Sequence, residues 1–179
     1  MGLDIRAISK IATKRTDPEQ YEFNELMDAE IGQFYINPDF ASHTSDYGLE
    51  PGVVDYIQTD ESTTESLRAG SYSGYNKFRN LLSLAVLGVK AETAWENVNK
   101  YSDKPLWDII NFSDCEGAID ASTSEKLRGQ FQSCRTVFED YITKDTDIGD
   151  MDTEHYMETY DGMIKCFALG SEDGVVIYG

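Results

Sequence analysis

The segment LRAGSYSGYNKFRNLLSLAVLG, residues 67–88, decides the fold because its pattern of apolar residues changes along its length. Residues 65–69 read as a strand, and beyond Gly70 the apolar residues repeat at about 3.6 positions, as they do on one face of a helix. That helical stripe comprises Phe78, Leu81, Leu82, Ala85 and Val86. Gly88 follows it and ends the predicted helix. A strand therefore leads into a helix through a short glycine-containing loop.

Further strands are predicted on both sides of this segment. Leu3, Ile5, Ala7 and Ile11 are interspersed with charged residues, which predicts that the first dozen residues form one strand with one buried face. Short strands are also expected at 31–36, 53–58 and 175–178. The polar stretch 59–64 makes 53–58 and 65–69 a candidate hairpin, while 39–48 reads as a surface loop. A strand at each end of the chain suggests one shared sheet.

Four more helices are predicted from periodicity and capping residues. The first covers 91–100, and a short second one begins near Pro105 and carries Trp107, Ile109 and Ile110. Ser122, Thr123 and Ser124 are candidate caps for a long helix to Lys144, and Asp152 or Thr153 for a last helix that ends at Gly170. The predicted core stripes of these two long helices are Leu127, Phe131, Cys134, Phe138, Tyr141 and Ile142, and Tyr156, Met157, Tyr160, Ile164 and Phe167. The expectation is a single α+β domain over residues 1–179: an antiparallel or mixed sheet with helices packed on one face.

Composition limits the functions that this chain can have. Thirty-three Asp and Glu against fifteen Lys and Arg give a net charge of −18, which disfavours direct binding to nucleic acid or an anionic membrane. Neither a signal peptide nor an apolar run long enough to span a membrane is visible, so we expect the protein in the cytoplasm of its host cell. Cys115, Cys134 and Cys166 have no metal-site spacing and are expected to be reduced thiols. No cofactor is predicted.

The most unusual stretch is 67–91, which contains Arg68, Lys77, Arg79 and Lys90 but not one Asp or Glu. At its start lies a loop rich in glycine, serine and tyrosine. Backbone N–H groups, hydroxyls and an arginine at a helix N-terminus can hold a phosphate, and tyrosine rings can stack on a base. The candidate ligand-binding residues of this loop are Arg68, Ser71, Tyr72, Ser73, Tyr75 and Asn76. The alternative is a purely structural turn in which Ser73 caps the helix and the tyrosines pack beneath it.

A second candidate group lies in 110–120, where a helix is predicted to end. Asn111, Asp114 and Glu116 offer amide and carboxylate oxygens that can accept hydrogen bonds from ribose or read a base edge. The alternative is a helix-ending turn with local caps at Ser113 and Asp114. If the two groups face one cleft, they form a nucleotide pocket.

Other candidate sites are weaker. Asp145, Asp147, Asp150 and Asp152 are spaced somewhat like a calcium loop, but Gly149 comes one place early for an EF-hand and Tyr156 replaces the required glutamate. A solvated acidic loop is the simpler interpretation. His43 and His155 are candidate general bases, although no nucleophile motif accompanies them.

Three motifs resemble a widespread family of small, uncharacterised bacteriophage and prophage proteins. They are MGLDIRA (1–7), LRAGSYSGYN (67–76) and INFSDCEG (110–117), and the resemblance spans residues 1 to about 135. It does not extend reliably to 13–51 or to the acidic tail beyond Thr143. Small acidic phage proteins often counter host defence, so the resemblance favours a protein that binds and sequesters a signalling nucleotide, of the cyclic or ADP-ribose type, without turnover. A homo-oligomer is expected.

Two alternatives belong to other classes. In the first, the protein is an acidic inhibitor that mimics nucleic acid and blocks a basic groove of a host defence enzyme. In the second, Asp114 and Glu116 serve as acid, base or metal ligands in an enzyme that cleaves the nucleotide. A scaffold or virion-associated domain without a ligand is a further possibility.

Overall fold

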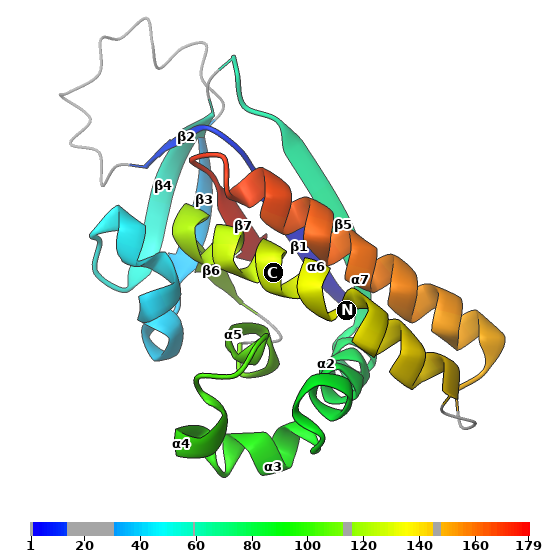
Figure 1. The fold of residues 1–179 in the computed structure, drawn as a ribbon. Coiled ribbons are helices and arrows are strands. Elements are labelled where there is room, and N and C mark those ends of the chain that lie inside the picture. The colour runs from blue at the N-terminus through cyan, green and yellow to red at the C-terminus, as the bar shows by residue number, and fades with distance from the viewer. Residues whose placement is uncertain (1, 14–30, 59, 113–115, 145–147) are drawn as a thin grey trace, which may run out of the picture.

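The chain folds into two antiparallel sheets with helices packed against them (Figure 1). The predicted α+β class is confirmed, although the sequence predicted one sheet and the structure has two. The computed structural model describes residues 2–13, 31–58, 60–112, 116–144 and 148–179. Within these residues, no helix is both long enough and apolar enough to cross a lipid bilayer.

The larger sheet has four strands in the order β5-β1-β7-β6. They are β1 (Gly2–Ile8), β5 (Thr64–Ser71), β6 (Gly117–Ile119) and β7 (Val175–Tyr178). The strands nearest the two ends of the chain pair with each other at the centre, which confirms the shared sheet. The sequence did not predict β6, because three buried residues are too short to show an alternating pattern.

The smaller sheet has the order β2-β4-β3, with β2 at Ile11–Thr13, β3 at Ile31–Ile36 and β4 at Gly52–Gln58. The single strand predicted over the first dozen residues is thus divided between the two sheets, because the chain turns at Lys10, whose φ is 51°. The predicted hairpin of 53–58 with 65–69 is therefore wrong. β4 pairs with β3 along its length, and β5 pairs with β1 in the other sheet. Proximity in the sequence suggested the hairpin, but the two strands belong to different sheets and each pairs with a strand that is farther away in the chain.

The loop predicted at 39–48 is also wrong, since Pro38–Tyr47 forms η2, a segment of 3₁₀ turns whose backbone leaves the helical region at Phe40 and Thr44. Asn37 caps this helix by accepting a hydrogen bond from the Asp39 N–H at 3.0 Å, and Gly48 ends it in the left-handed region at φ 60°. His43 and Thr44 are buried in it. The polar composition of this segment is typical of a loop, so the sequence did not predict η2. One side of η2 nevertheless packs against β6, β3 and the start of α6.

Three long helices carry the main core: α2 (Tyr72–Leu87), α6 (Ala121–Lys144) and α7 (Asp150–Gly170). Figure 1 shows α6 and α7 lying across one face of the larger sheet. Leu3, Ile5 and Ala7 of β1 point into this core, as the alternation predicts. Most residues of the predicted helical stripes are buried. The ones that are only partly covered are Ala85, Val86, Cys134, Tyr141, Met157 and Ile164.

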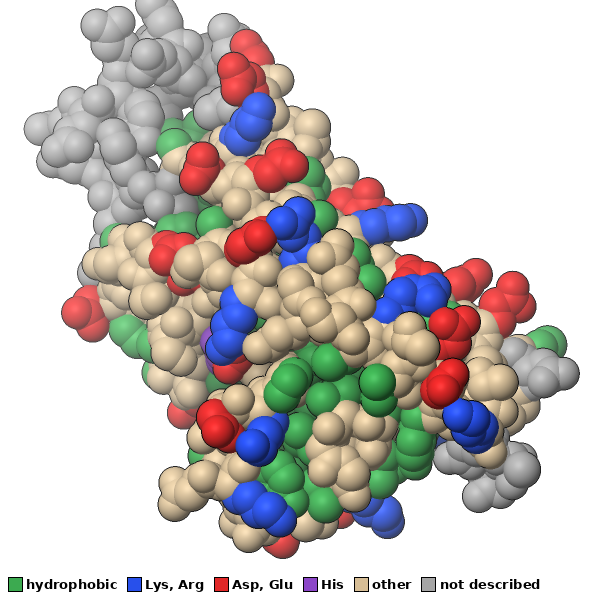
Figure 2. All heavy atoms as spheres, in the orientation of Figure 1, with side chains coloured by type: hydrophobic (Ala, Val, Ile, Leu, Met, Phe, Trp, Pro, Cys, Tyr) green, Lys and Arg blue, Asp and Glu red, His purple; other side chains and the backbone are tan. Residues whose placement is uncertain are grey.

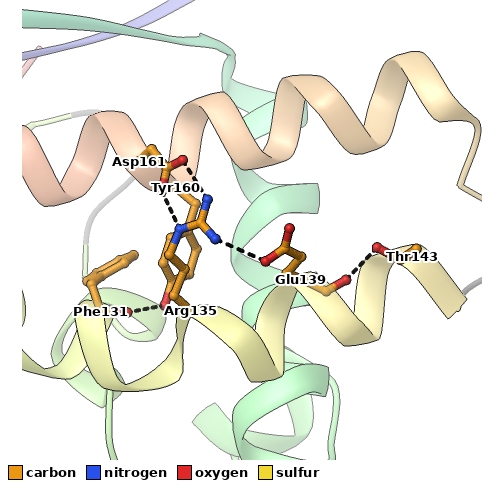
Figure 3. Close-up of polar contacts among 6 residues, drawn as sticks. All are labelled: Phe131, Arg135, Glu139, Thr143, Tyr160 and Asp161. Carbon is orange, nitrogen blue, oxygen red and sulfur yellow. Dashed lines mark hydrogen bonds and ion pairs between the residues drawn. The ribbon is translucent and has the colours of Figure 1, made fainter.

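Hydrogen bonds and an ion pair hold α6 to α7 (Figure 3). The Tyr160 hydroxyl donates to the Phe131 carbonyl at 2.6 Å, and its ring stacks on Phe138 at 4.8 Å between centroids. Arg135 binds the Asp161 carboxylate and also donates to Glu139. The two helices are thereby held in register by one buried hydrogen bond inside the aromatic core and by an ion pair at its rim.

Between α2 and α6 the chain makes three short helices, α3 (Ala91–Trp95), α4 (Val98–Tyr101) and α5 (Trp107–Ile110). The single helix predicted over 91–100 is thus divided, because Asn97 at φ −127° and ψ 47° leaves the helical region. The predicted short helix carrying Trp107 is confirmed as α5.

The long helices begin differently from the prediction. Asp120, rather than Ser122, Thr123 or Ser124, caps α6: its Oδ1 accepts from the Thr123 N–H at 2.9 Å. The Asp46 carboxylate accepts from the Ser122 N–H at 2.8 Å and so caps the same helix from η2. α7 begins at Asp150 after Gly149, two residues before the earlier of its predicted caps.

Candidate functional site

The predicted phosphate-binding loop occupies the junction between β5 and α2. Ser71 caps α2 by accepting from the Gly74 N–H at 3.1 Å, and the Ser71 and Ser73 hydroxyls lie 3.0 Å apart. The capping residue is therefore Ser71 and not Ser73. The Ser71 and Ser73 side chains are exposed, but the Ser71 hydroxyl already accepts the capping hydrogen bond of α2.

Arg68 does not share a face with the long helices. It lies on β5 between Leu67 and Ala69, whose side chains belong to the main core, so its own side chain points to the opposite face of the sheet. There it forms an ion pair with Asp4, its cross-strand neighbour on β1. Arg68 is thus held away from the helical side of the sheet.

The two tyrosines of the loop pack inward. Tyr75 is fully buried, stacked on Phe78 and edge-on to Tyr178. Tyr72 is half-buried against the same core. In this conformation the Tyr75 ring offers no surface on which a base could stack, and Tyr72 offers only part of its ring.

Arg79 connects the two predicted groups. Its side chain is 6% exposed, and its guanidinium donates to Asn76 Oδ1 in the first group and to the Phe112 carbonyl beside the second. The guanidinium carbon also lies 5.2 Å from the centre of the Trp95 ring, in cation–π geometry. The sequence alone places Arg79 among the cations of residues 67–91 but does not identify it as a candidate ligand-binding residue. Its position next to Phe78 and three residues before Leu82, on the buried side of the helix, could have indicated that Arg79 is buried.

Arg79 forms part of an open cleft of about 430 Å³ between α2 and α3. The cleft is lined by Asn76, Arg79, Asn80, Ala91, Glu92 and Trp95. Trp95 is the large aromatic side chain of this cleft, and 36% of the residue's area is exposed. Its indole N–H donates to the Ile110 carbonyl at 2.9 Å. Asn80 Oδ1 accepts from the Ala91 N–H at 3.1 Å and so holds α3 against α2.

The second predicted group borders this cleft through its backbone. Asn111 lies half-buried at the end of α5, between Ile110 and Phe112, whose carbonyls are bound by Trp95 and Arg79. Glu116 is exposed, and its carbonyl accepts from the Asn37 side chain at 3.3 Å. Asp114 lies outside the described residues. The structure thus brings Asn76 and the backbone next to Asn111 together, and leaves Arg68 on another face.

His43, a candidate general base, lies in a separate cluster. Its ring packs between Phe40 and Phe112, and its Nε2 is 3.4 Å from Asp108 Oδ1. Lys126 binds the other Asp108 oxygen at 2.6 Å. Burial raises the pKa of Asp108, but hydrogen bonds from His43 and Lys126 outweigh it, so this pKa lies below its ordinary value. The cluster ties η2 to α5 and α6.

The remaining candidates are His155 and the suggested calcium loop. His155 is exposed on α7, with its ring 5.8 Å from that of Tyr156. Asp145 and Asp147 of the suggested calcium loop lie outside the described residues, and elsewhere no three His, Cys, Asp or Glu side chains gather as they would around a metal ion.

Comparison of the chain with protein-family models, with curated proteins and with solved structures finds no match.

Proposed function

We propose that the cleft at Arg79 binds a small nucleotide-type ligand and that the protein retains it without turnover. The observation that carries this proposal is the position of Arg79: a nearly buried cation that links the loop at Asn76 to the backbone beside Asn111, beneath the exposed ring of Trp95. A cationic, aromatic and amide-lined cleft suits a planar ligand with polar edges.

Each wall of the cleft has a role in this binding mode. The Trp95 ring is a stacking platform, and stacking of one base on an aromatic side chain is worth about 1–3 kcal/mol. Asn80 uses its oxygen on Ala91, so its amide nitrogen is the group that can donate to a ring acceptor. Glu92 supplies a carboxylate that accepts hydrogen bonds from ribose hydroxyls.

The phosphate end of such a ligand needs surroundings free of negative charge. Residues 67–91 contain no Asp or Glu, and the exposed Lys90 directly precedes Ala91 in the cleft wall. In a chain of net charge −18, this is the stretch where a phosphate meets least repulsion. The ligand is therefore oriented with its base over Trp95 and its phosphate toward Lys90. The sequestration of a defence signal, suggested by the resemblance to phage proteins, is the biological role that fits such binding.

The acidic-inhibitor alternative is less well supported. A nucleic-acid mimic needs rows of carboxylates without cations between them, because it must present a phosphate-like pattern to a basic groove. On the face shown in Figure 2, Lys and Arg side chains stand among the Asp and Glu side chains, around an apolar patch. That face favours ligand or protein contacts over mimicry.

The test is to incubate the purified protein with a pool of cyclic dinucleotides, cyclic ADP-ribose isomers, NAD and ATP, remove unbound material by filtration, denature the protein and identify what is released by mass spectrometry. An intact nucleotide recovered in near-stoichiometric amount supports the proposal. A converted product shows that the site is an enzyme, and recovery of no nucleotide overturns the proposal.

Two aromatic substitutions then locate the site. Trp95→Leu should abolish recovery, whereas Tyr72→Leu, which alters the predicted loop at the start of α2, should leave it unchanged. The reverse result would place the ligand at the loop and refute the cleft. Trp95→Phe keeps a ring on which a base can stack but loses the N–H that donates to the Ile110 carbonyl of α5. Nucleotide binding weaker than in the unaltered protein but stronger than in Trp95→Leu would show that both the stacking and this hydrogen bond contribute.

A further inference from the structure

A second groove lies between β5 and α7. It measures about 470 Å³ and is lined by Glu65, Ser66, Leu67, Glu154, Met157, Glu158, Asp161, Gly162 and Lys165. The α7 residues recur every three or four positions, so they form one stripe of the helix facing the strand. α7 comes very close to β5 here, since a Cβ at Gly162 would lie 2.7 Å from Leu67 Cδ1.

The groove borders an open edge of the larger sheet. β5 is the outermost strand, and its one partner among the described strands is β1. An edge strand presents unpaired N–H and C=O groups that can pair with another chain. In such recognition the backbone of the edge strand supplies the hydrogen bonds.

The register shows which residues point outward from this edge. Asp4 and Gly179 exchange both backbone hydrogen bonds, at 3.0 and 3.1 Å, so the Asp4 backbone points toward β7. In an antiparallel ladder the direction alternates along the strand, and the backbone of Ile5 therefore points toward β5, where Leu67 is its partner. It follows that Leu67 bonds to β1 and that the N–H and C=O of Ser66 point out of the sheet.

The charge of the groove defines the kind of strand that fits. Glu65, Glu154 and Glu158 are exposed and make no ion pair with any described residue, whereas the Asp161 carboxylate is bound by Arg135. Lys165 is the one cation in the lining. Figure 2 shows acidic side chains gathered along the upper edge of α7 in that view. Leu67 and Met157 supply apolar surface beneath them.

We infer that the groove binds an extended segment of a partner protein with Lys or Arg at alternate positions, which adds to β5 as a further strand. Side chains of a strand alternate between its two faces, so every second residue of the segment would face α7 and its glutamates. A second copy of this chain fits poorly, because two such edges would bring their own carboxylates together. Nucleic acid is repelled by the same charges.

The probe is an acetylated and amidated nonapeptide in which lysine alternates with valine, labelled for fluorescence anisotropy. The control peptide alternates lysine with proline and has the same charge but cannot complete a β ladder. The lysine–valine peptide should bind at a 1:1 ratio in low salt, and the lysine–proline peptide at least about tenfold more weakly. Equal binding of the two peptides would show general attraction to an acidic protein and would overturn the inference.

Ser66 gives the matched pair of variants. Ser66→Pro removes the outward N–H without touching the β1 ladder, and should weaken the lysine–valine peptide by about tenfold. Ser66→Ala keeps the N–H and should bind as the unaltered protein does. Circular dichroism and the melting temperature check that both variants are folded. Should Ser66→Pro fail to fold, hydrogen exchange decides: the peptide must slow exchange of the Ser66 amide, and absence of that protection refutes strand addition.

Charge variants test the role of α7 separately. The double change Glu154→Gln and Glu158→Gln should weaken peptide binding by about tenfold, whereas Glu50→Gln with Glu172→Gln, which changes the net charge equally at exposed positions outside the groove, should change it by less than about threefold. Equal effects of the two doubles would assign the attraction to net charge and refute the groove as the binding site.

Discussion

Arg135 and Asp161 join α6 to α7 through two parallel hydrogen bonds, from Nε to Oδ1 at 2.8 Å and from Nη2 to Oδ2 at 2.9 Å. The hydrogen bonds from Arg135 hold the pKa of Asp161 below its ordinary value, although burial acts in the opposite direction. This pair lies at the rim of the helical layer, beside the groove that β5 and α7 form.

Asp161→Asn should lower the free energy of unfolding by about 0.5–1 kcal/mol at pH 7, because the pair is partly exposed to solvent. A carboxylate with a lowered pKa stabilises the fold above its unfolded-state pKa, and this contribution disappears as the pH falls through the folded-state pKa. Urea unfolding at pH 7 and at about pH 2, below both the unfolded-state and the folded-state pKa, measures both values. The exposed pair of Asp140 with Lys144 is the control, and Asp140→Asn should have a smaller effect. If the loss of unfolding free energy caused by Asp161→Asn is the same at low pH as at pH 7, the ion pair does not contribute as predicted.

Asp120→Ala should destabilise the protein by about 1–3 kcal/mol, since it removes a fully buried carboxylate and leaves two N–H donors without their acceptor. One is the Thr123 N–H at the start of α6, and the other is the Asp46 N–H of η2 at 3.0 Å. Thermal unfolding followed by circular dichroism measures the loss. Ser133→Ala on the exposed face of α6 should stay within about 0.5 kcal/mol, and an equal loss there would argue against the cap.

Gly174→Ala and Gly129→Ala should act in opposite directions. A Cβ at Gly174 would overlap the Ile8 carbonyl oxygen and force β1 away from the turn before β7, at a cost of about 1–3 kcal/mol. Gly129 lies in α6 with nothing near its Cβ position, so alanine there should stabilise the helix by about 0.5–1 kcal/mol. Urea unfolding of the two variants is the measurement. A neutral Gly174→Ala would show that β1 and the turn are not packed so closely.

The described thiols should react slowly in the folded protein. Burial raises the pKa of Cys166 to about 12, with the nearby Glu65 carboxylate adding to the effect, and burial also raises the pKa of Cys134. Since the thiolate is the reactive form, Cys166 should be labelled by a disulfide reagent at pH 8 only on unfolding, and Cys134 faster than Cys166. The assay uses a Cys115→Ser background. Rapid labelling of Cys166 in the native state would contradict its burial.

The sequence by itself determined the elements whose pattern is long and regular. The alternation of Leu3, Ile5 and Ala7, and the stripe that includes Phe131 and Phe138, correctly predict β1 and α6 because each records which side of an element loses contact with water. The α+β class and the shared sheet of the two ends follow from these patterns. Periodicity also predicted α2 and its end at Gly88.

Only the tertiary structure decided how these elements meet. Strand partners are chosen by contacts between distant residues, so β4 joined β3 and β5 joined β1 although 53–58 and 65–69 are neighbours in the chain. The same holds for the candidate site. The residue types at Tyr75 and Arg68 suit a nucleotide, but packing buries the first and places the second on the opposite sheet face, while Arg79 comes to lie beneath Trp95. Local sequence specifies which side chains exist along an element, whereas long-range packing decides which of them share a surface.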